Sequence, residues 1–95
     1  MYVLALDIDL HLPECRSLKA KRAVLRPVVE GLRSRFQVSV AEVGDQDRWQ
    51  RARVGVAVVG GTEGHARDVT DEIERWVWAR PGIDVLSMER TWLET

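Results

Sequence analysis

Alternating apolar and polar residues near the start of the chain predict a half-buried strand. From Leu4 to Leu12 every second residue is leucine or isoleucine, and the residues between them fall with Val3 on the opposite face. A period of two is the spacing of side chains along one face of a strand. Pro13 ends the pattern, because proline has no amide hydrogen to give to a sheet ladder.

Helical spacing follows in residues 18–36. One face of this segment is apolar and consists of Leu18, Leu25, Val28, Val29, Leu32 and Phe36. The spacing predicts an amphipathic helix with that face buried. Ser17 precedes the helix as the expected N-cap. Pro27 lies inside it, where the lost hydrogen bond is expected to kink the helix.

A second amphipathic helix is predicted after Thr62, which is a suitable N-cap in front of Glu63. Its expected buried face consists of Ala66, Val69, Ile73, Trp76 and Val77. The sequence Arg-Pro-Gly at residues 80–82 is expected to end this helix.

Three further strands complete the pattern. One is indicated by Val38, Val40 and Val43, another by Val54, Val56 and Val58, and a last one, residues 83–93, by Leu86, Met88 and Trp92 on one face. The resulting order, β-α-β-β-α-β, predicts an α+β, ferredoxin-like two-layer sandwich. In this fold two helices cover one face of a four-stranded antiparallel sheet, and the first and third strands are central.

Length and composition fit a single domain over residues 1–95. The chain is 45% hydrophobic and 31% charged, with a formal net charge of −1. These values are typical of a folded domain, and the net charge alone favours neither nucleic-acid nor membrane binding. Cys15 is the only cysteine, so an internal disulfide is excluded, and we expect a partly buried thiol rather than a nucleophile. With no pattern of a signal peptide or spanning helix, we expect a cytoplasmic protein.

Positive charge is concentrated in one part of the chain. Residues 16–35 hold seven of the fourteen basic residues and one acid, whereas the second predicted helix is mostly acidic. A basic stripe at the start of a helix is typical of a phosphate-binding surface. The candidate nucleic-acid or anion-binding residues are Arg16, Ser17, Lys19, Lys21, Arg22 and Arg26. The alternative is a solvated helix face whose charges pair with the acidic neighbour.

The basic residues are mostly arginine, with twelve arginines and two lysines. This bias fits either a hot habitat or a GC-rich genome, and the sequence does not separate the two origins.

Acidic and imidazole side chains share one face of the first strand, at Asp7, Asp9 and His11. They are weak candidates for a divalent-metal site in a hydrolase, since such side chains follow one another at about 6.6 Å. The alternative is a solvated sheet face with Arg53 as the counter-charge. We favour the alternative, because no further ligand cluster accompanies them, and we expect no metal, cofactor or catalytic residue.

The sheet face without helices is expected to be small and apolar at one end, where Val3, Ala5 and Ala57 lie. It has no aromatic side chain on the two central strands, so base stacking as in RRM domains is not expected there. An uncovered, weakly polar face favours contact with a second copy. We therefore predict a homo-oligomer, with a dimer favoured.

Three tryptophans are further interface candidates, namely Trp49, Trp78 and Trp92. Trp49 stands in the polar segment GDQDRWQRA, residues 44–52, so it either folds back onto the core or meets a partner. We favour core packing or a subunit contact over a separate ligand site in this loop. Trp78 lies two residues beyond the core residue Trp76 and is expected to point elsewhere.

Three segments resemble the YlxP-like family of small bacterial proteins. They are CRSLKAKRAVL at residues 15–25, FQVSVAEVGDQDRWQRARVGVAVV at residues 36–59 and MERTWL at residues 88–93. The resemblance covers nearly the whole chain and implies a ferredoxin-like fold, although family members usually lack a proline like Pro27 in the first helix. Genes of the family often lie among those for translation initiation and ribosome assembly factors. By association, this implies a connection to RNA or translation, and no catalytic residues are implied.

These observations predict a non-catalytic, self-associating interaction domain. Its expected partner is RNA or a ribosomal component, bound through the basic first helix. The alternatives are a metal-dependent hydrolase that uses the cluster on the first strand and a regulatory oligomer that binds only protein.

Overall fold

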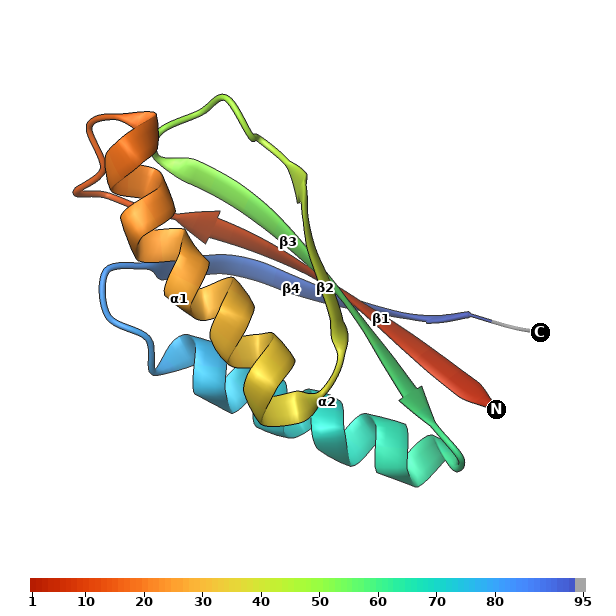
Figure 1. The fold of residues 1–95 in the computed structure, drawn as a ribbon. Coiled ribbons are helices and arrows are strands. Elements are labelled where there is room, and N and C mark those ends of the chain that lie inside the picture. Colours follow the sequence, from red (N-terminus) through yellow and green to blue (C-terminus); the bar gives the residue numbers. More distant parts are fainter. Residues whose placement is uncertain (94–95) are drawn as a thin grey trace.

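The computed structural model describes residues 1–93 and contains six elements in the order expected from the sequence (Figure 1). They are β1 (Tyr2–His11), α1 (Leu18–Phe36), β2 (Ser39–Gly44), β3 (Arg51–Gly60), α2 (Glu63–Trp78) and β4 (Asp84–Leu93). The strands form one antiparallel sheet in the order β2-β3-β1-β4. Both helices lie on the same side of it (Figure 1). The ferredoxin-like sandwich is therefore confirmed, with β1 and β3 at its centre.

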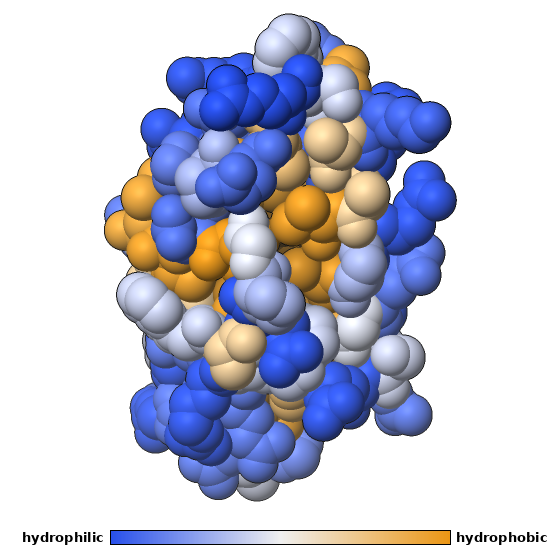
Figure 2. Space-filling model, turned by 90° about the vertical axis from the view of Figure 1, so that its left-hand side faces the viewer, coloured by the Kyte–Doolittle hydropathy of each residue, from blue (hydrophilic) through white to orange (hydrophobic). Residues whose placement is uncertain are grey.

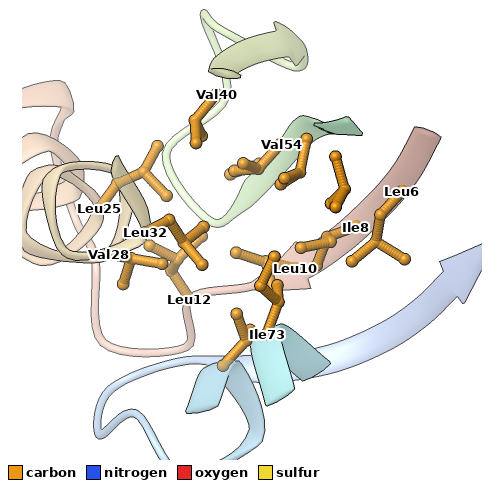
Figure 3. Packing of buried hydrophobic residues seen from close by; sticks show 14 of the residues in the cluster. Leu6, Ile8, Leu10, Leu12, Leu25, Val28, Leu32, Val40, Val54 and Ile73 are labelled. Carbon is orange, nitrogen blue, oxygen red and sulfur yellow. The ribbon is translucent and has the colours of Figure 1, made fainter. Parts of the chain in front are cut away.

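The core lies between the sheet and the two helices. Leu4, Leu6, Ile8 and Leu10 of β1 point into it and are buried, as is Leu12 just after the strand. In Figure 3, Leu25, Val28 and Leu32 of α1 approach this row from one side, and Ile73 of α2 lies close to it. Burying an aliphatic side chain of this size is worth about 1.5–3 kcal/mol. All of this packing is on one face of the sheet, so the other face is left open.

Both helices begin at the predicted caps. The Ser17 hydroxyl accepts a hydrogen bond from the amide of Ala20 at 3.0 Å, and the Thr62 hydroxyl accepts one from the amide of His65 at 3.1 Å. Each bond satisfies one of the amides that a helix start leaves without a partner. α1 continues through Pro27 as one helix. Within residues 1–93, no helix has the length and hydropathy needed to cross a membrane.

The prediction for the inward face of β4 was wrong at Leu86. The register between β4 and β1 shifts between Asp9 and Leu10, which marks a β-bulge. As a result Val85 packs against the core, and Leu86 turns outward and is 51% exposed. A bulge inserts one residue into the alternation, which moves a side chain to the other face.

Candidate nucleic-acid interface

Four exposed cations follow the start of α1, and we call this set the basic stripe: Arg16, Lys19, Arg22 and Arg26. The first precedes the N-cap, and the others recur at intervals of three and four residues, which places them on one side of the helix. Figure 2 views the molecule from the side on which α1 begins, and hydrophilic residues surround a smaller hydrophobic area there. The stripe is therefore an accessible row of positive charge.

The basic stripe has no acidic partner among residues 1–93. Six other cations form ion pairs, namely Lys21, Arg48, Arg51, Arg53, Arg67 and Arg90. The acids of α2 that form pairs do so away from α1, because Arg67 binds Glu63 on the same helix and Arg90 of β4 binds Asp71 and Glu74. The pairing of α1 cations with their acidic neighbour, weighed above as an alternative, is not found in the described part of the chain.

Lys21 does not belong to this surface, contrary to the prediction. Its side chain is only 2% exposed and points towards the loop between β2 and β3. The ammonium donates hydrogen bonds to the carbonyl oxygens of Asp45 at 2.6 Å and Gln46 at 3.4 Å, and it forms an ion pair with Glu42 at 3.1 Å. A buried charge is stable only with partners of this kind. Lys21 therefore anchors the loop to α1.

The helical phase of Lys21 is the signal that sequence reasoning missed. Lys21 lies three residues after Leu18 and four before Leu25, so it falls on the buried face of α1. Lys19, two residues earlier, falls on the exposed face. In the sequence the two lysines of RSLKAKR look alike, but only Lys19 is free to meet a ligand.

The loop between β2 and β3, residues 45–50, presents Trp49 to solvent. Its side chain is 53% exposed, so of the two favoured roles core packing was wrong, and a subunit contact stays a prediction. The loop itself is tied down at both ends, by Lys21 at its start and by a hydrogen bond of 2.9 Å from the Leu12 amide to the Gln50 carbonyl at its end. The side-chain amide of Gln50 (Nε2) also donates a hydrogen bond to the carbonyl of Pro13 at 3.4 Å. Trp49 thus stands on a fixed loop.

A concavity of about 660 Å³ lies beside this tryptophan. Its lining residues are His11, Arg16, Asp47, Arg48, Trp49, Gln50 and Arg51. Arg16 belongs both to this lining and to the basic stripe. The concavity and the stripe therefore form one continuous surface.

Each side chain of the cluster on β1 has an oppositely charged or hydrogen-bonding neighbour in the described part of the chain. Asp7 pairs with Arg53, Asp9 with Arg51 at 2.7 Å, and His11 with Asp84 at 3.2 Å. Within residues 1–93, no three acidic, histidine or cysteine side chains converge as a metal would require. The hydrogen bond and charge of the Asp7 carboxylate raise the pKa of Arg53 above its usual value. The ion pair between Asp7 and Arg53 that the alternative expected is therefore present.

The open face of the sheet is apolar at the end near the chain termini. We call the apolar part the open apolar face: Val3, Ala5, Ala41, Val43, Gly55, Ala57, Val59 and Leu93. Val43, Val59 and Leu93 are 51%, 62% and 52% exposed. Small side chains beside the larger ones leave a shallow trough of about 460 Å³, which Ala5 and Ala57 help to line.

The sequence matches a known protein family. Residues 3–90 match the family described as "Protein of unknown function (DUF503)". The chain belongs to this family. It is 32% identical over 76 residues to the uncharacterized protein YlxP of Bacillus subtilis (strain 168), an alignment that covers 80% of this chain and 83% of that protein. The resemblance read from the sequence is therefore confirmed.

Among solved structures, a de novo designed protein with a ferredoxin fold, LFR1 1, aligns with the whole chain. The alignment covers 100% of this chain and 88% of the designed protein, with a TM-score of 0.47 and 13% sequence identity. The description of the DUF503 family names no function, so only the residues of this chain indicate one.

The remaining residues singled out from the sequence of this DUF503 family member differ in how deeply they are buried. Ser17 is partly buried and caps α1. Trp78 is 63% exposed at the end of α2, as its phase predicts. Trp92 is partly buried, packs against the core and lies edge-on to Tyr2, and its place at an interface stays a prediction. Cys15 is buried, which fits a structural thiol.

Proposed function

We propose that this protein is a non-catalytic RNA-binding domain that contacts phosphate groups through the basic stripe on α1. The observation that carries the proposal is that four cations without an ion pair within residues 1–93 follow one another along one side of α1. Six other cations have ion pairs, and the remaining arginines without one are Arg33, Arg35, Arg75 and Arg80. An arginine or lysine without a carboxylate partner keeps its donors for a phosphate. A cytoplasmic location, as expected from the sequence, would give it access to RNA.

The test is an affinity measurement on two variants of equal charge. Arg22→Glu/Arg26→Glu reverses the centre of the stripe, and Arg67→Glu/Arg75→Glu reverses two exposed arginines of α2. Each reversal changes the charge by −2, so both double variants move from −1 to −5. We expect the α1 variant to bind a labelled single-stranded RNA at least about tenfold more weakly than the α2 variant. Equal losses in both would mean that net charge alone governs binding.

The salt dependence of the same titration counts the phosphate contacts. The slope of log affinity against log salt changes by about 0.7 for each phosphate contact to a single strand. Removing two contacts should therefore lower the slope by about 1.4 in the α1 variant. Fluorescence anisotropy between roughly 50 and 200 mM salt measures it. Wild-type protein without salt-sensitive RNA binding would end the proposal.

We also propose that a second copy of this chain covers the open apolar face. Most of its charged neighbours are paired, since Asp7 pairs with Arg53 and Asp9 pairs with Arg51 at 2.7 Å. Glu89, which also lines the trough, has no ion pair within residues 1–93 and adds one negative charge per copy. Five residues along each of four strands span about 16 by 19 Å, or about 300 Å² per copy. Two copies would bury about 600 Å² in total, below the roughly 1,000 Å² of a stable interface, so the proposed dimer is weak and its population rises with concentration.

Sedimentation of two matched variants tests the dimer. Val59→Asp puts a charge on the open apolar face, and Leu86→Asp puts one on an equally exposed strand position outside it. We expect wild-type protein and the Leu86 variant to dimerise with rising concentration and the Val59 variant to remain monomeric. A monomeric wild type at high concentration would overturn the proposal, and a Val59 variant that still dimerises would place the interface elsewhere.

A further inference from the structure

Trp49 combines features that core packing and solubility do not explain. It is a large aromatic side chain, 53% exposed, on a loop that Lys21 and Gln50 hold in place. A loop that is already held in place loses little conformational freedom when a ligand stacks on its exposed indole. We infer that the concavity beside Trp49 is a stacking site for one base of a single-stranded nucleic acid whose phosphates lie on the basic stripe.

The charges around the concavity favour a neutral ring over a phosphate in this position. Arg51 is held by Asp9 at 2.7 Å, and His11 lies 3.2 Å from Asp84. Arg48 lies 3.6 Å from Asp45. The two arginine pairs neutralise Arg48 and Arg51, and the carboxylate of Asp47 offsets the charge of Arg16 in the same lining. A phosphate is therefore disfavoured here, whereas an uncharged base gains from stacking on the indole.

The position of Arg16 connects the two parts of the inferred surface. It lines the concavity and is also the first residue of the basic stripe, which continues over the next turns of α1. From Leu18 to Arg26 the helix rises about 12 Å. A single strand with one base on Trp49 can therefore pass Arg16 and lay its following phosphates along α1. Stacking beside a positively charged track is a general way to bind single strands without sequence preference.

The inference rests on the proposed function, and one pair of probes separates the two. The first probe is a labelled oligouridine of roughly eight nucleotides, within the site sizes of single-strand binding domains. The second is inorganic polyphosphate of similar charge, which has phosphates but no bases. The variants are Trp49→Ala, Trp49→Phe and, as the control, Trp78→Ala, which removes a tryptophan exposed to a similar degree (63%) from α2.

We expect Trp49→Ala to weaken oligouridine binding at least about fivefold, the smallest loss typical of one stacked base. Trp49→Phe keeps a ring and should stay within about threefold of the wild type. Trp78→Ala should not change either affinity, and Trp49→Ala should leave polyphosphate binding unchanged. Circular dichroism of each variant verifies that the fold is retained.

Three other outcomes overturn the inference. Full oligouridine affinity in Trp49→Ala, with a loss in Arg22→Glu/Arg26→Glu, removes the stacking site and leaves the RNA proposal standing. Equal losses for both probes in Trp49→Ala assign Trp49 a structural role. Wild-type protein that binds neither probe overturns the stacking site and the RNA proposal together.

Discussion

The two helices lie in one layer and carry opposite charges, but their exposed charges differ in what they contact. On α2, Glu63 pairs with Arg67, and Asp71 and Glu74 pair with Arg90 of β4. On α1, the exposed cations of the basic stripe have no such partner within residues 1–93. By charge alone, the two helices differ only in sign. Their ion pairs show the further difference that α2 uses exposed charges in structural contacts, whereas the basic stripe of α1 is available to a ligand.

The difference extends to how each helix is fastened. α2 is linked to β4 at the surface through Arg90. The hydrogen bond to Glu74 raises the pKa of Arg90 although partial burial lowers it, and Asp71 raises this pKa further. α1 is held to the rest of the protein on its buried side, by its apolar face and by Lys21. Because these contacts lie on its inner side, the outer side of α1 is left free. Substitutions on the inner and outer sides of α1 should therefore have effects of very different size.

The largest stability effect is expected for Lys21→Met. Methionine keeps the buried stem but loses the ion pair with Glu42 and the hydrogen bonds to two loop carbonyls. Hydrogen bonds to a charged group contribute about 1.5–3 kcal/mol, so the free energy of unfolding should fall by about 2 kcal/mol. Urea unfolding measures this loss.

Lys19→Met is the matched control, because it makes the same change on the exposed side of α1. It should alter the free energy of unfolding by less than about 0.5 kcal/mol. If the two variants unfold at the same urea concentration, Lys21 does not anchor the loop. The loop should also loosen in Lys21→Met, so that Trp49 fluorescence becomes more accessible to a quencher such as iodide.

Two glycines give a second comparison between the helices, with opposite signs. A Cβ at Gly31 of α1 would lie 2.5 Å from the indole of Trp76, and that indole is fixed by Phe36 and by Arg80 stacked at 4.4 Å. Overpacking of this kind costs about 1–3 kcal/mol, which outweighs the gain of about 1 kcal/mol from replacing a helical glycine. Gly31→Ala should therefore destabilise the protein by about 1 kcal/mol.

Gly64→Ala on α2 should have the opposite effect. Nothing lies within 4 Å of a Cβ at Gly64, so only the helix-propensity gain remains. This gain is about 0.5 kcal/mol near a helix start. Thermal unfolding of the two variants should thus move the midpoint in opposite directions. Stabilisation by Gly31→Ala would show that the contact between α1 and Trp76 is looser than the structure has it.

Arg90→Met tests the surface link of α2. The change removes both ion pairs, which are partly exposed, and ion pairs of this kind contribute about 0.2–1 kcal/mol each. We expect a loss of about 1 kcal/mol that becomes smaller at high salt. Since its folded pKa is raised, the contribution of Arg90 is fully present below the usual arginine pKa and is lost only as the pH rises through the folded value. A loss independent of salt would assign the effect to packing of the Arg90 stem.

The sequence predicts most of the fold because each element carries its own periodicity. The caps Ser17 and Thr62, the buried row of β1 and the central position of β3 all follow from local patterns. The misplaced Leu86 lies at a bulge, and a bulge depends on pairing with a strand far away in the sequence. Periodicity along one segment does not contain that information.

The candidate site was predictable only in part. The concentration of cations on α1 is visible in the sequence, and so is the exposure of Trp78. The helical phase of Lys21 is sufficient to predict that its side chain points inward. Its partners are loop carbonyls, which no sequence pattern identifies. The exposure of Trp49 depends on how the loop is tied to Lys21 and Pro13, which requires the folded chain.

The smallest effect is expected on the outer side of α1, where Arg22→Gln/Arg26→Gln removes two charges that have no acidic partner in the described residues. These cations lie four residues apart, a spacing at which like charges on a helix repel each other by about 0.2–0.5 kcal/mol. The variant should therefore be as stable as the wild type or slightly more stable, with the gain disappearing at high salt. Differential scanning calorimetry at two salt concentrations measures it. A loss of more than about 1 kcal/mol would mean that these arginines stabilise the fold as Arg90 does, and the distinction between the helices would disappear. Unchanged stability together with lost RNA affinity is the combination expected of residues that act on a partner.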